Sequence, residues 1–207
     1  VQSTTLCPSG DSYPEYMSVF NNKLYFGAEG CNGAGKELWS YDGTNTTLLT
    51  DISPPFGGDQ LGPLELTAGS TALYFTADEG SFGRELWRWD GASASRLTDI
   101  NPGLGSSFPQ ALAFLGGDLS FAADDGLAGQ EIWRYDGANA HRVLNLAQSP
   151  DGSGPSSFIL FNNDLYFTGD NGVGGAELWK ALPRLGAKEV INLGAGDSAL
   201  KEGDVIE

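Results

Sequence analysis

Short apolar runs alternate with turn-forming residues along the whole chain, and one order of runs returns four times. Each repeat begins with an apolar run, which is followed by an aromatic run and then by an acidic, glycine-rich segment. A tryptophan-containing run and an aliphatic run complete the repeat. The aromatic runs are residues 24–26, 73–75, 119–121 and 165–167. No stretch keeps a 3.6-residue period over a useful length, so the pattern predicts strands.

The clearest repeat is a motif in which glutamate, an aliphatic residue and tryptophan are followed by an Asp-Gly pair. Its copies occupy residues 36–43, 84–91 and 130–137, and a fourth copy at 176–180 lacks the Asp-Gly pair. The tryptophans at positions 39, 87, 133 and 179 lie 48, 46 and 46 residues apart. Four short strands fit into each repeat between Gly, Asn, Asp or Pro turns, which is typical of a propeller blade.

The predicted fold is therefore all-β, a β-propeller of four four-stranded blades in a single domain over residues 1–207. The predicted blades are residues 8–53, 54–102, 103–150 and 151–194, with 1–7 as a candidate ring-closing strand and 195–207 as an acidic tail. Three arrangements of the chain ends remain open. The N-terminal piece pairs onto the last blade and closes the ring, the chain was cut from a longer array, or the C-terminal strand is displaced. We favour a self-closed ring, because an open array leaves two aromatic sheet faces in water.

Side-chain alternation indicates sheets that are covered on both faces. Along the third strand of the second repeat, Trp87 and Trp89 point to one face and Leu86 to the other. We interpret the tryptophans as packing between blades. Trp89 replaces a tyrosine found in the first and third copies, and it is the tryptophan expected to reach the surface.

The motif resembles that of the ELWxxDGT repeat proteins, which are large exported bacterial proteins with many tandem copies. The matching residues are Glu37-Leu38-Trp39 with Asp42-Gly43-Thr44, Glu85-Leu86-Trp87 with Asp90-Gly91, and Glu131-Ile132-Trp133 with Asp136-Gly137. The resemblance covers nearly the whole chain. It implies export and a repetitive β-fold, and it implies no settled activity.

Charge excludes several classes of partner. The 207 residues include 11 Lys and Arg against 27 Asp and Glu, a formal net charge of −16. Binding to nucleic acid and docking on anionic lipid both need clustered Lys and Arg side chains. Neither partner is therefore expected. No apolar run approaches the roughly 20 residues of a membrane-spanning helix, so no membrane insertion is expected.

Two cysteines, Cys7 and Cys31, are present. The even count, the acidic surface and the low lysine content predict one disulfide between them in an exported protein, either secreted or at the cell surface. The alternative is two unrelated buried thiols.

The acidic turns have two interpretations. One is a calcium site, because calcium takes several oxygen ligands on glycine-bent loops. Its candidate ligands are Asp78, Glu79, Asp124, Asp125 and Asp170, with Glu85, Glu131 and Glu177 about seven residues further on. The other is structural: the aspartates cap their own hairpins, and the repeated glutamates accept hydrogen bonds from neighbouring turns. No cofactor besides calcium is predicted.

Catalysis finds little support in the sequence. His141 is the single histidine, no nucleophile motif is present, and carboxylates that recur in every repeat are typical of scaffold. We therefore predict no catalytic residues and no enzyme.

The remaining prediction is a non-catalytic binding or adhesion module that recognises a glycan or a protein at one end of the propeller. Candidate ligand-binding residues lie mainly in the segments that enter each first strand, where the repeats differ most. They are Tyr13, Gln60, Phe108, Gln110 and Phe158, together with Trp89. The alternatives are a structural component of an extracellular assembly and a carboxylate-based glycoside hydrolase.

Overall fold

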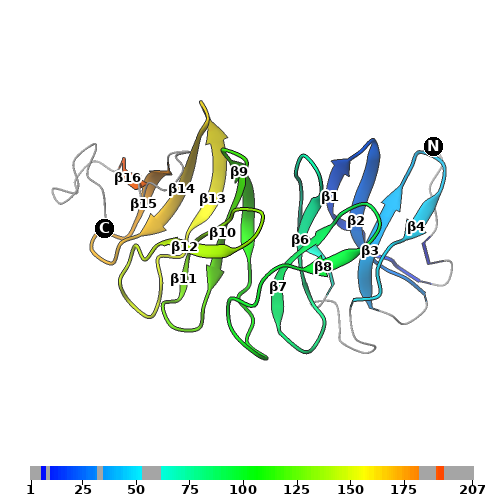
Figure 1. Cartoon of the computed structure of the whole chain (residues 1–207), viewed down its shortest axis with the longest axis horizontal. Helices are drawn as coiled ribbons and strands as arrows, with labels where there is room; N and C mark the ends of the chain where they lie inside the picture. The colour runs from blue at the N-terminus through cyan, green and yellow to red at the C-terminus, as the bar shows by residue number, and fades with distance from the viewer. Residues whose placement is uncertain (1–5, 8–9, 32–34, 53–61, 182–189, 194–207) are drawn as a thin grey trace. The chain divides into compact units, whose positions relative to one another are not determined.

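The computed structural model describes residues 6–7, 10–31, 35–52, 62–181 and 190–193. In these ranges every regular element is a β-strand, and the strands form four antiparallel sheets of four consecutive strands each (Figure 1). The all-β prediction with four strands per repeat is confirmed. No helix in these ranges is long and apolar enough to cross a bilayer. The proposed ring-closing strand at 1–7, apart from residues 6 and 7, and the tail at 195–207 lie outside the described residues.

Each sheet corresponds to one sequence repeat. Sheet 1 contains β1 (Glu15–Phe20), β2 (Lys23–Glu29), β3 (Lys36–Tyr41) and β4 (Thr46–Leu48). Sheet 2 contains β5 (Leu64–Ala68), β6 (Leu73–Asp78), β7 (Arg84–Trp89) and β8 (Ala94–Arg96). Sheet 3 contains β9 (Gln110–Leu115), β10 (Asp118–Asp124), β11 (Gln130–Tyr135) and β12 (Ala140–Leu144). Sheet 4 contains β13 (Ser156–Phe161), β14 (Asp164–Asp170), β15 (Ala176–Ala181) and β16 (Val190–Asn192).

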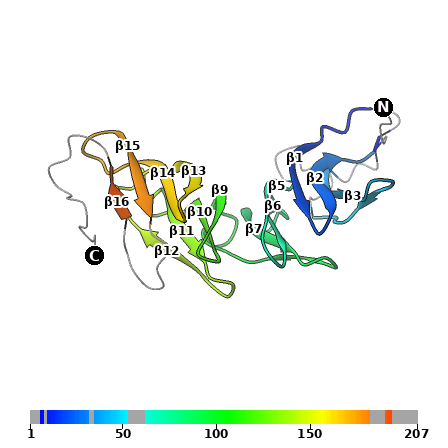
Figure 2. The ribbon, with the colours of Figure 1, turned by 90° about the horizontal axis from the view of Figure 1, so that it is seen from above.

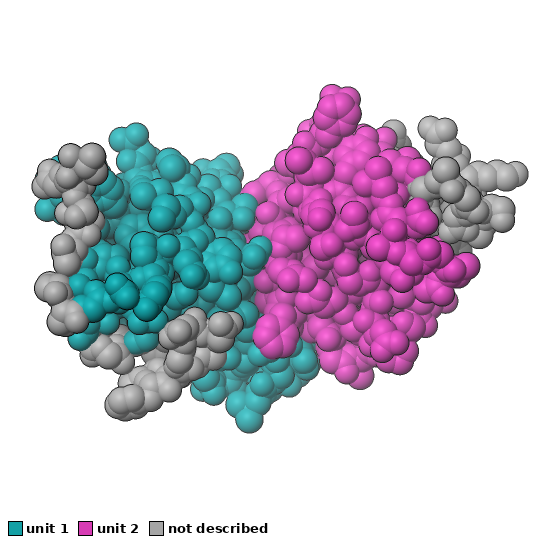
Figure 3. Space-filling view, turned by 180° about the vertical axis from the view of Figure 1, so that it is seen from behind, with its two compact units in different colours: residues 1–106 teal, residues 107–207 magenta. Residues whose placement is uncertain are grey.

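The chain forms two compact units, residues 1–106 with sheets 1 and 2 and residues 107–207 with sheets 3 and 4 (Figure 3). Inside each unit the first strands of the two sheets contact each other: β1 contacts β5, and β9 contacts β13 (Figures 1 and 2). Each unit is therefore a pair of sheets stacked side by side.

The turns follow the residue types in the sequence. Asn21 and Asn22 join β1 to β2 with φ angles of 46° and 59°, and Asn162 and Asn163 repeat this turn at 50° and 67°. Asparagine tolerates this left-handed region better than most residues. The Asp-Gly turn after β3 is capped by Asp42 Oδ1, which accepts the N–H groups of residues 44 and 45 at 2.8 and 2.7 Å.

The same cap returns in the next two sheets at Asp90 and Asp136. Backbone N–H groups hold the pKa of all three carboxyls below its ordinary value; the donor with the largest effect is residue 45, 93 or 139, respectively. Because the folded pKa is lowered, the stabilisation is present above the unfolded pKa, about 3.9, and is lost as pH falls through the folded value.

We therefore expect acid to weaken these turns below about pH 4. The melting temperature of the wild type should fall more between pH 5 and pH 3 than that of the triple variant Asp42→Asn, Asp90→Asn, Asp136→Asn, whose amide oxygens accept the same bonds without titrating. Asp99→Asn, at an exposed aspartate outside these turns, is the matched control. Equal losses in the wild type and the triple variant would show that the caps do not titrate.

Strand register gives each sheet two distinct faces. In sheet 2, Leu73 pairs with Trp89 and Phe75 with Trp87, so these four side chains share one face, and Leu86 lies on the other. We call the first the tryptophan face and the second the leucine face, and use the same names in all four sheets; in sheet 3 the leucine position is an isoleucine.

The two buried cores lie between a leucine face and a tryptophan face. In the first unit Tyr25 and Leu38 of sheet 1 cluster with Phe75, Trp87 and Trp89 of sheet 2. In the second unit the core repeats this combination of faces. It contains Leu115, Ile132, Leu144 and Leu146 of sheet 3 and its following segment, with Leu165, Phe167, Trp179 and Ala181 of sheet 4. The interpretation of tryptophan as packing between repeats therefore holds for Trp87, Trp89 and Trp179.

Trp89 differs from its prediction. It is only 6% exposed, because its indole enters the core against sheet 1 and does not reach the surface as a ligand platform would. Trp87 and Trp179 are also fixed by hydrogen bonds, since each indole N–H donates to a backbone oxygen of the neighbouring strand at 3.1 and 2.9 Å.

Candidate functional site

The repeated glutamate is the most deeply buried ionisable side chain of the motif. Glu37, Glu85 and Glu131 are the second residues of β3, β7 and β11 and are at most 1% exposed. A buried carboxylate is costly unless hydrogen-bond donors surround it. The residues that supply these donors therefore reveal what the glutamate does.

In the first two sheets the donors come from the segment after the fourth strand. Glu37 Oε2 accepts the Thr50 hydroxyl at 2.7 Å and the Ile52 N–H at 2.8 Å. Glu85 Oε2 accepts the Thr98 hydroxyl at 2.7 Å and the N–H of residue 100 at 3.1 Å. Each glutamate thus fastens the chain that leaves its sheet. We call this arrangement the glutamate clamp.

Sheet 3 reaches the same arrangement with a different donor. Leu144 stands where the second repeat has Thr98, so the hydroxyl of that position is missing. Ser153, in the segment that leads to sheet 4, supplies it instead: its hydroxyl donates to Glu131 Oε2 at 2.7 Å and its N–H donates to Oε1 at 3.1 Å. The Leu146 N–H donates at 3.0 Å.

Burial raises the pKa of Glu131, and the Ser153 hydroxyl and the backbone N–H groups act against that rise. Because the folded pKa lies above the unfolded one, the stabilising effect of protonating Glu131 is present at low pH and is lost as pH rises through the folded pKa. Its pH dependence is therefore opposite in sign to that of the Asp-Gly turns.

The predicted calcium ligands in the acidic turns bond to their own hairpins. Asp78, Asp124 and Asp170 each accept the N–H of the glycine two residues ahead at 2.7 Å. Asp125 Oδ1 accepts two more N–H groups, and its Oδ2 pairs with Arg142 at 3.0 Å. Glu79 pairs with Arg96 at 3.3 Å. These are the contacts of the hairpin-capping alternative.

The structure does not gather the predicted ligands into a metal cluster. Over the described ranges, no group of three or more His, Cys, Asp or Glu side chains is arranged to hold an ion. Glu177 at the fourth motif is half-buried, unlike its three buried counterparts. Calcium binding itself stays a prediction.

A thermal-shift measurement separates the two interpretations. Weak extracellular sites are filled by calcium at about 5 mM. If the carboxylates cap hairpins, the melting temperature in about 5 mM calcium should match that in chelator to within about 1 °C. Magnesium at the same concentration controls for ionic strength. A rise of several degrees with calcium alone would restore the metal interpretation, because a ligand that binds only the folded state raises its stability.

The described candidates for ligand binding belong to both units, Tyr13 and Trp89 to the first and Phe108, Gln110 and Phe158 to the second. Tyr13 and Phe108 are exposed, with positive φ angles of 42° and 45°. Gln110 hydrogen-bonds Gln130 at 2.6 Å, and Phe158 packs on Phe167 with ring centroids 5.7 Å apart. Gln60 lies outside the described residues.

Two pockets lined by described residues lie in the first unit. One of about 410 Å³ lies between the segment after β4 and sheet 2, where Asp51, Glu79 and the edges of Trp87 and Trp89 line it. Sequence reasoning missed the second, of about 180 Å³, which lies on the tryptophan face of sheet 1. Its apolar lining includes Leu6, Met17, Leu24 and Phe26.

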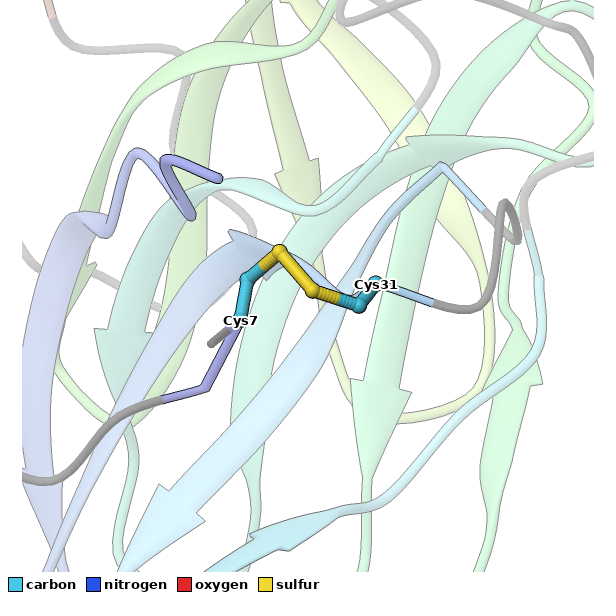
Figure 4. Close-up of a disulfide and its surroundings, with 2 residues drawn as sticks. All are labelled: Cys7 and Cys31. Carbon is cyan, nitrogen blue, oxygen red and sulfur yellow. A yellow bond between two sulfur atoms is a disulfide. The ribbon is translucent and has the colours of Figure 1, made fainter. Parts of the chain in front are cut away.

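The predicted disulfide is confirmed. Cys7 and Cys31 are bonded with their Cα atoms 4.9 Å apart, which ties the N-terminal segment to the turn after β2 (Figure 4). Such a bond fits an oxidising, extracellular type of environment.

The surroundings of the single histidine and of the buried glutamates bear on nucleophilic catalysis. The exposed His141 has one carboxylate near it, Asp136, at 3.7 Å, and that aspartate already caps a turn. The three buried motif glutamates bond to hydroxyls and backbone N–H groups, as described above.

Comparison with known proteins shows a shared fold. No protein-family model and no curated protein sequence matches the chain. Among solved structures, the β-propeller domain of the Trilobed protease from Pyrococcus furiosus superposes with a TM-score of 0.61 at 10% identity, covering 88% of this chain and 54% of that one. A Mycobacterium tuberculosis puromycin-hydrolysing peptidase gives 0.59 at 14%, covering 89% and 29%.

An acylaminoacyl peptidase bound to a chloromethyl ketone gives a TM-score of 0.59 at 9% identity, covering 88% of this chain and 27% of that one. This chain thus spans between about a quarter and a little over half of the length of these proteins. Identities this low show the fold alone, and the fold has β-propeller neighbours.

These comparisons contradict the predicted binding or adhesion module, because the similar solved structures are two peptidases and the β-propeller domain of a protease. That prediction was based on the variability of the loops that enter each first strand.

Proposed function

We propose that the four sheets are the blades of a β-propeller, and that this propeller is the catalytically silent part of an exported hydrolase of the peptidase kind. The observation that carries the proposal is the superposition on the β-propeller domain of a protease. The chemistry of hydrolysis would then lie on another domain or another chain.

The described side chains support a silent role. A hydrolase needs a nucleophile or an activated water beside a group that accepts a proton. Here the buried carboxylates of the motif already accept at least two hydrogen bonds each, from hydroxyls and backbone N–H groups. Carboxylates saturated in this way serve as scaffold.

Export is the second part of the proposal. The Cys7–Cys31 bond supports a secreted or surface-bound protein, since disulfides persist in oxidising compartments. The Glu-Leu-Trp and Asp-Gly motif, with its likeness to the exported ELWxxDGT repeat proteins, supports the same location.

The experiment has two arms. The purified chain with its disulfide intact is incubated with fluorogenic acyl-aminoacyl and prolyl peptides and with a fluorophosphonate probe, and we expect neither turnover nor labelling. An antibody against the chain is then used on the secreted fraction of the source organism, where we expect the captured material to cleave the peptides and to react with the probe.

Material captured with an antibody against an unrelated exported protein is the control. Turnover by the isolated chain would overturn the silent role. Captured material that contains the chain and lacks peptidase activity would overturn the association with a peptidase.

A further inference from the structure

Two apolar sheet faces are open to solvent, one in each unit. On the leucine face of sheet 4, Phe161 is 61% exposed and Leu178 is 46% exposed. On the tryptophan face of sheet 1, Met17 is 59% exposed and Val19 is 67% exposed. Apolar surface gathered in this way marks a place where another surface packs.

The internal repeat shows what covers such a leucine face. Phe20 occupies in sheet 1 the position of Phe161 in sheet 4, at the end of the first strand before an Asn-Asn turn, and it is 5% exposed. Leu38 likewise matches Leu178 and is fully buried. In the first unit the cover is the tryptophan face of sheet 2. Within the described residues of its own unit, no tryptophan face packs against the leucine face of sheet 4.

The open face of sheet 1 has the required residues. Phe20 lies in one core cluster with Leu73 and Phe75, and Leu24 and Phe26 stand at the same two positions in sheet 1. Leu24 and Phe26 line the cavity of about 180 Å³. This pocket is open at the surface, its lining also includes Ser12 and Tyr41, and Phe26 is 6% exposed at its base. An enclosed apolar cavity of roughly 150 Å³ accepts benzene, so the pocket has the volume of a phenyl group.

We propose that two copies of this chain associate head to tail, with the leucine face of sheet 4 in one copy packed on the tryptophan face of sheet 1 in the other. Phe161 of the first copy enters the cavity on the second, beside Leu24 and Phe26. The contact repeats between chains the face-to-face packing seen twice within the chain. It does not depend on the proposed link to a hydrolase.

We favour packing between two copies over a ring closed within one chain, because this chain is shorter than a similar propeller domain. The chain covers 54% of a protease β-propeller domain, so that domain has room for almost as many residues again. Propellers usually contain about four to eight blades, and two copies of four sheets reach the upper end of this range. The ring expected from the sequence would instead close with one chain.

The charge of the chain gives the association a signature. Each copy carries a formal charge of −16, so the copies repel each other at long range and screening by salt weakens that repulsion. An apolar contact between like-charged copies should tighten as salt rises, whereas a contact held by ion pairs would loosen.

Sedimentation equilibrium of the disulfide-intact chain tests the proposal. We expect a dimer whose dissociation constant falls between 50 mM and 500 mM NaCl, a range in which the Debye length drops from about 14 Å to about 4 Å. Phe161→Asp and Val19→Asp should each raise that constant by at least about tenfold, because each places a charge in the buried contact. Leu127→Asp, at an exposed turn outside both faces, is the matched control and should change nothing.

Mixing the two variants distinguishes head-to-tail packing from a symmetric contact. Phe161→Asp keeps an intact sheet 1 face and Val19→Asp keeps an intact sheet 4 face, so the mixture should form a heterodimer through one sound interface. Circular dichroism of each variant verifies that it is folded. A monomeric wild type at all salt concentrations, or a mixture that stays monomeric, would overturn the proposal.

Discussion

Replacing Glu85 with alanine is expected to lower the free energy of unfolding by roughly 3–5 kcal/mol. The side chain is fully buried, and it accepts the Thr98 hydroxyl at 2.7 Å and the backbone N–H of residue 100 at 3.1 Å. Alanine leaves these donors buried without an acceptor, and it opens a cavity where the carboxylate was. Urea unfolding followed by circular dichroism measures the change.

The fourth motif supplies a matched control. Glu177 stands at the same position of the repeat and is only half-buried, so Glu177→Ala should cost less than about 1 kcal/mol. Glu85→Gln should fall between the two, since its amide oxygen still accepts while its NH2 group finds no acceptor. Equal losses at Glu85 and Glu177 would show that the glutamate clamp does not stabilise the fold.

Trp179→Ala is the second large effect, with an expected loss of roughly 3–5 kcal/mol. The indole is fully buried in the core of the second unit, and its N–H donates to the Gly169 oxygen at 2.9 Å. The substitution removes both the packing and the hydrogen bond. Thermal and urea unfolding of the variant measure the loss.

Trp39 separates the packing from the hydrogen bond. Its indole N–H donates to the Ala28 oxygen at 3.1 Å, the same bond at the same motif position, but the side chain is only half-buried. Trp39→Ala should therefore cost about half as much or less, because area removed from water sets most of the effect. A loss as large as that of Trp179→Ala would mean that the hydrogen bond dominates.

The repeat was sufficient to predict the strands and the turns. Alternation along the motif placed Trp87 opposite Leu86, and the Gly, Asn, Asp and Pro residues between the runs predicted turns. Residues 21, 22, 162 and 163 are asparagines that form such turns with positive φ. These features depend on neighbours in the sequence. Trp89 was misjudged because its burial depends on a different sheet, which its own repeat does not describe.

The site was predicted less well than the fold. Sequence spacing left both calcium binding and hairpin capping open for the carboxylates, with capping favoured, because both use oxygen atoms on glycine-rich turns. The contact of Glu131 with Ser153 spans 22 residues and replaces a threonine that sheet 3 lacks. The unusual leucine at position 144 signals the missing hydroxyl, but only the fold shows which residue supplies it.

The most direct test of the stacked-sheet account is a double-mutant cycle between Ile132 on sheet 3 and Trp179 on sheet 4. Both are almost fully buried and belong to one cluster. If the tryptophan face packs on the preceding leucine face, unfolding energies of Ile132→Ala, Trp179→Ala and the double variant should give a coupling of about 0.5–3 kcal/mol. Effects that add to within about 0.3 kcal/mol would contradict the account, because residues on sheets that do not pack together act independently.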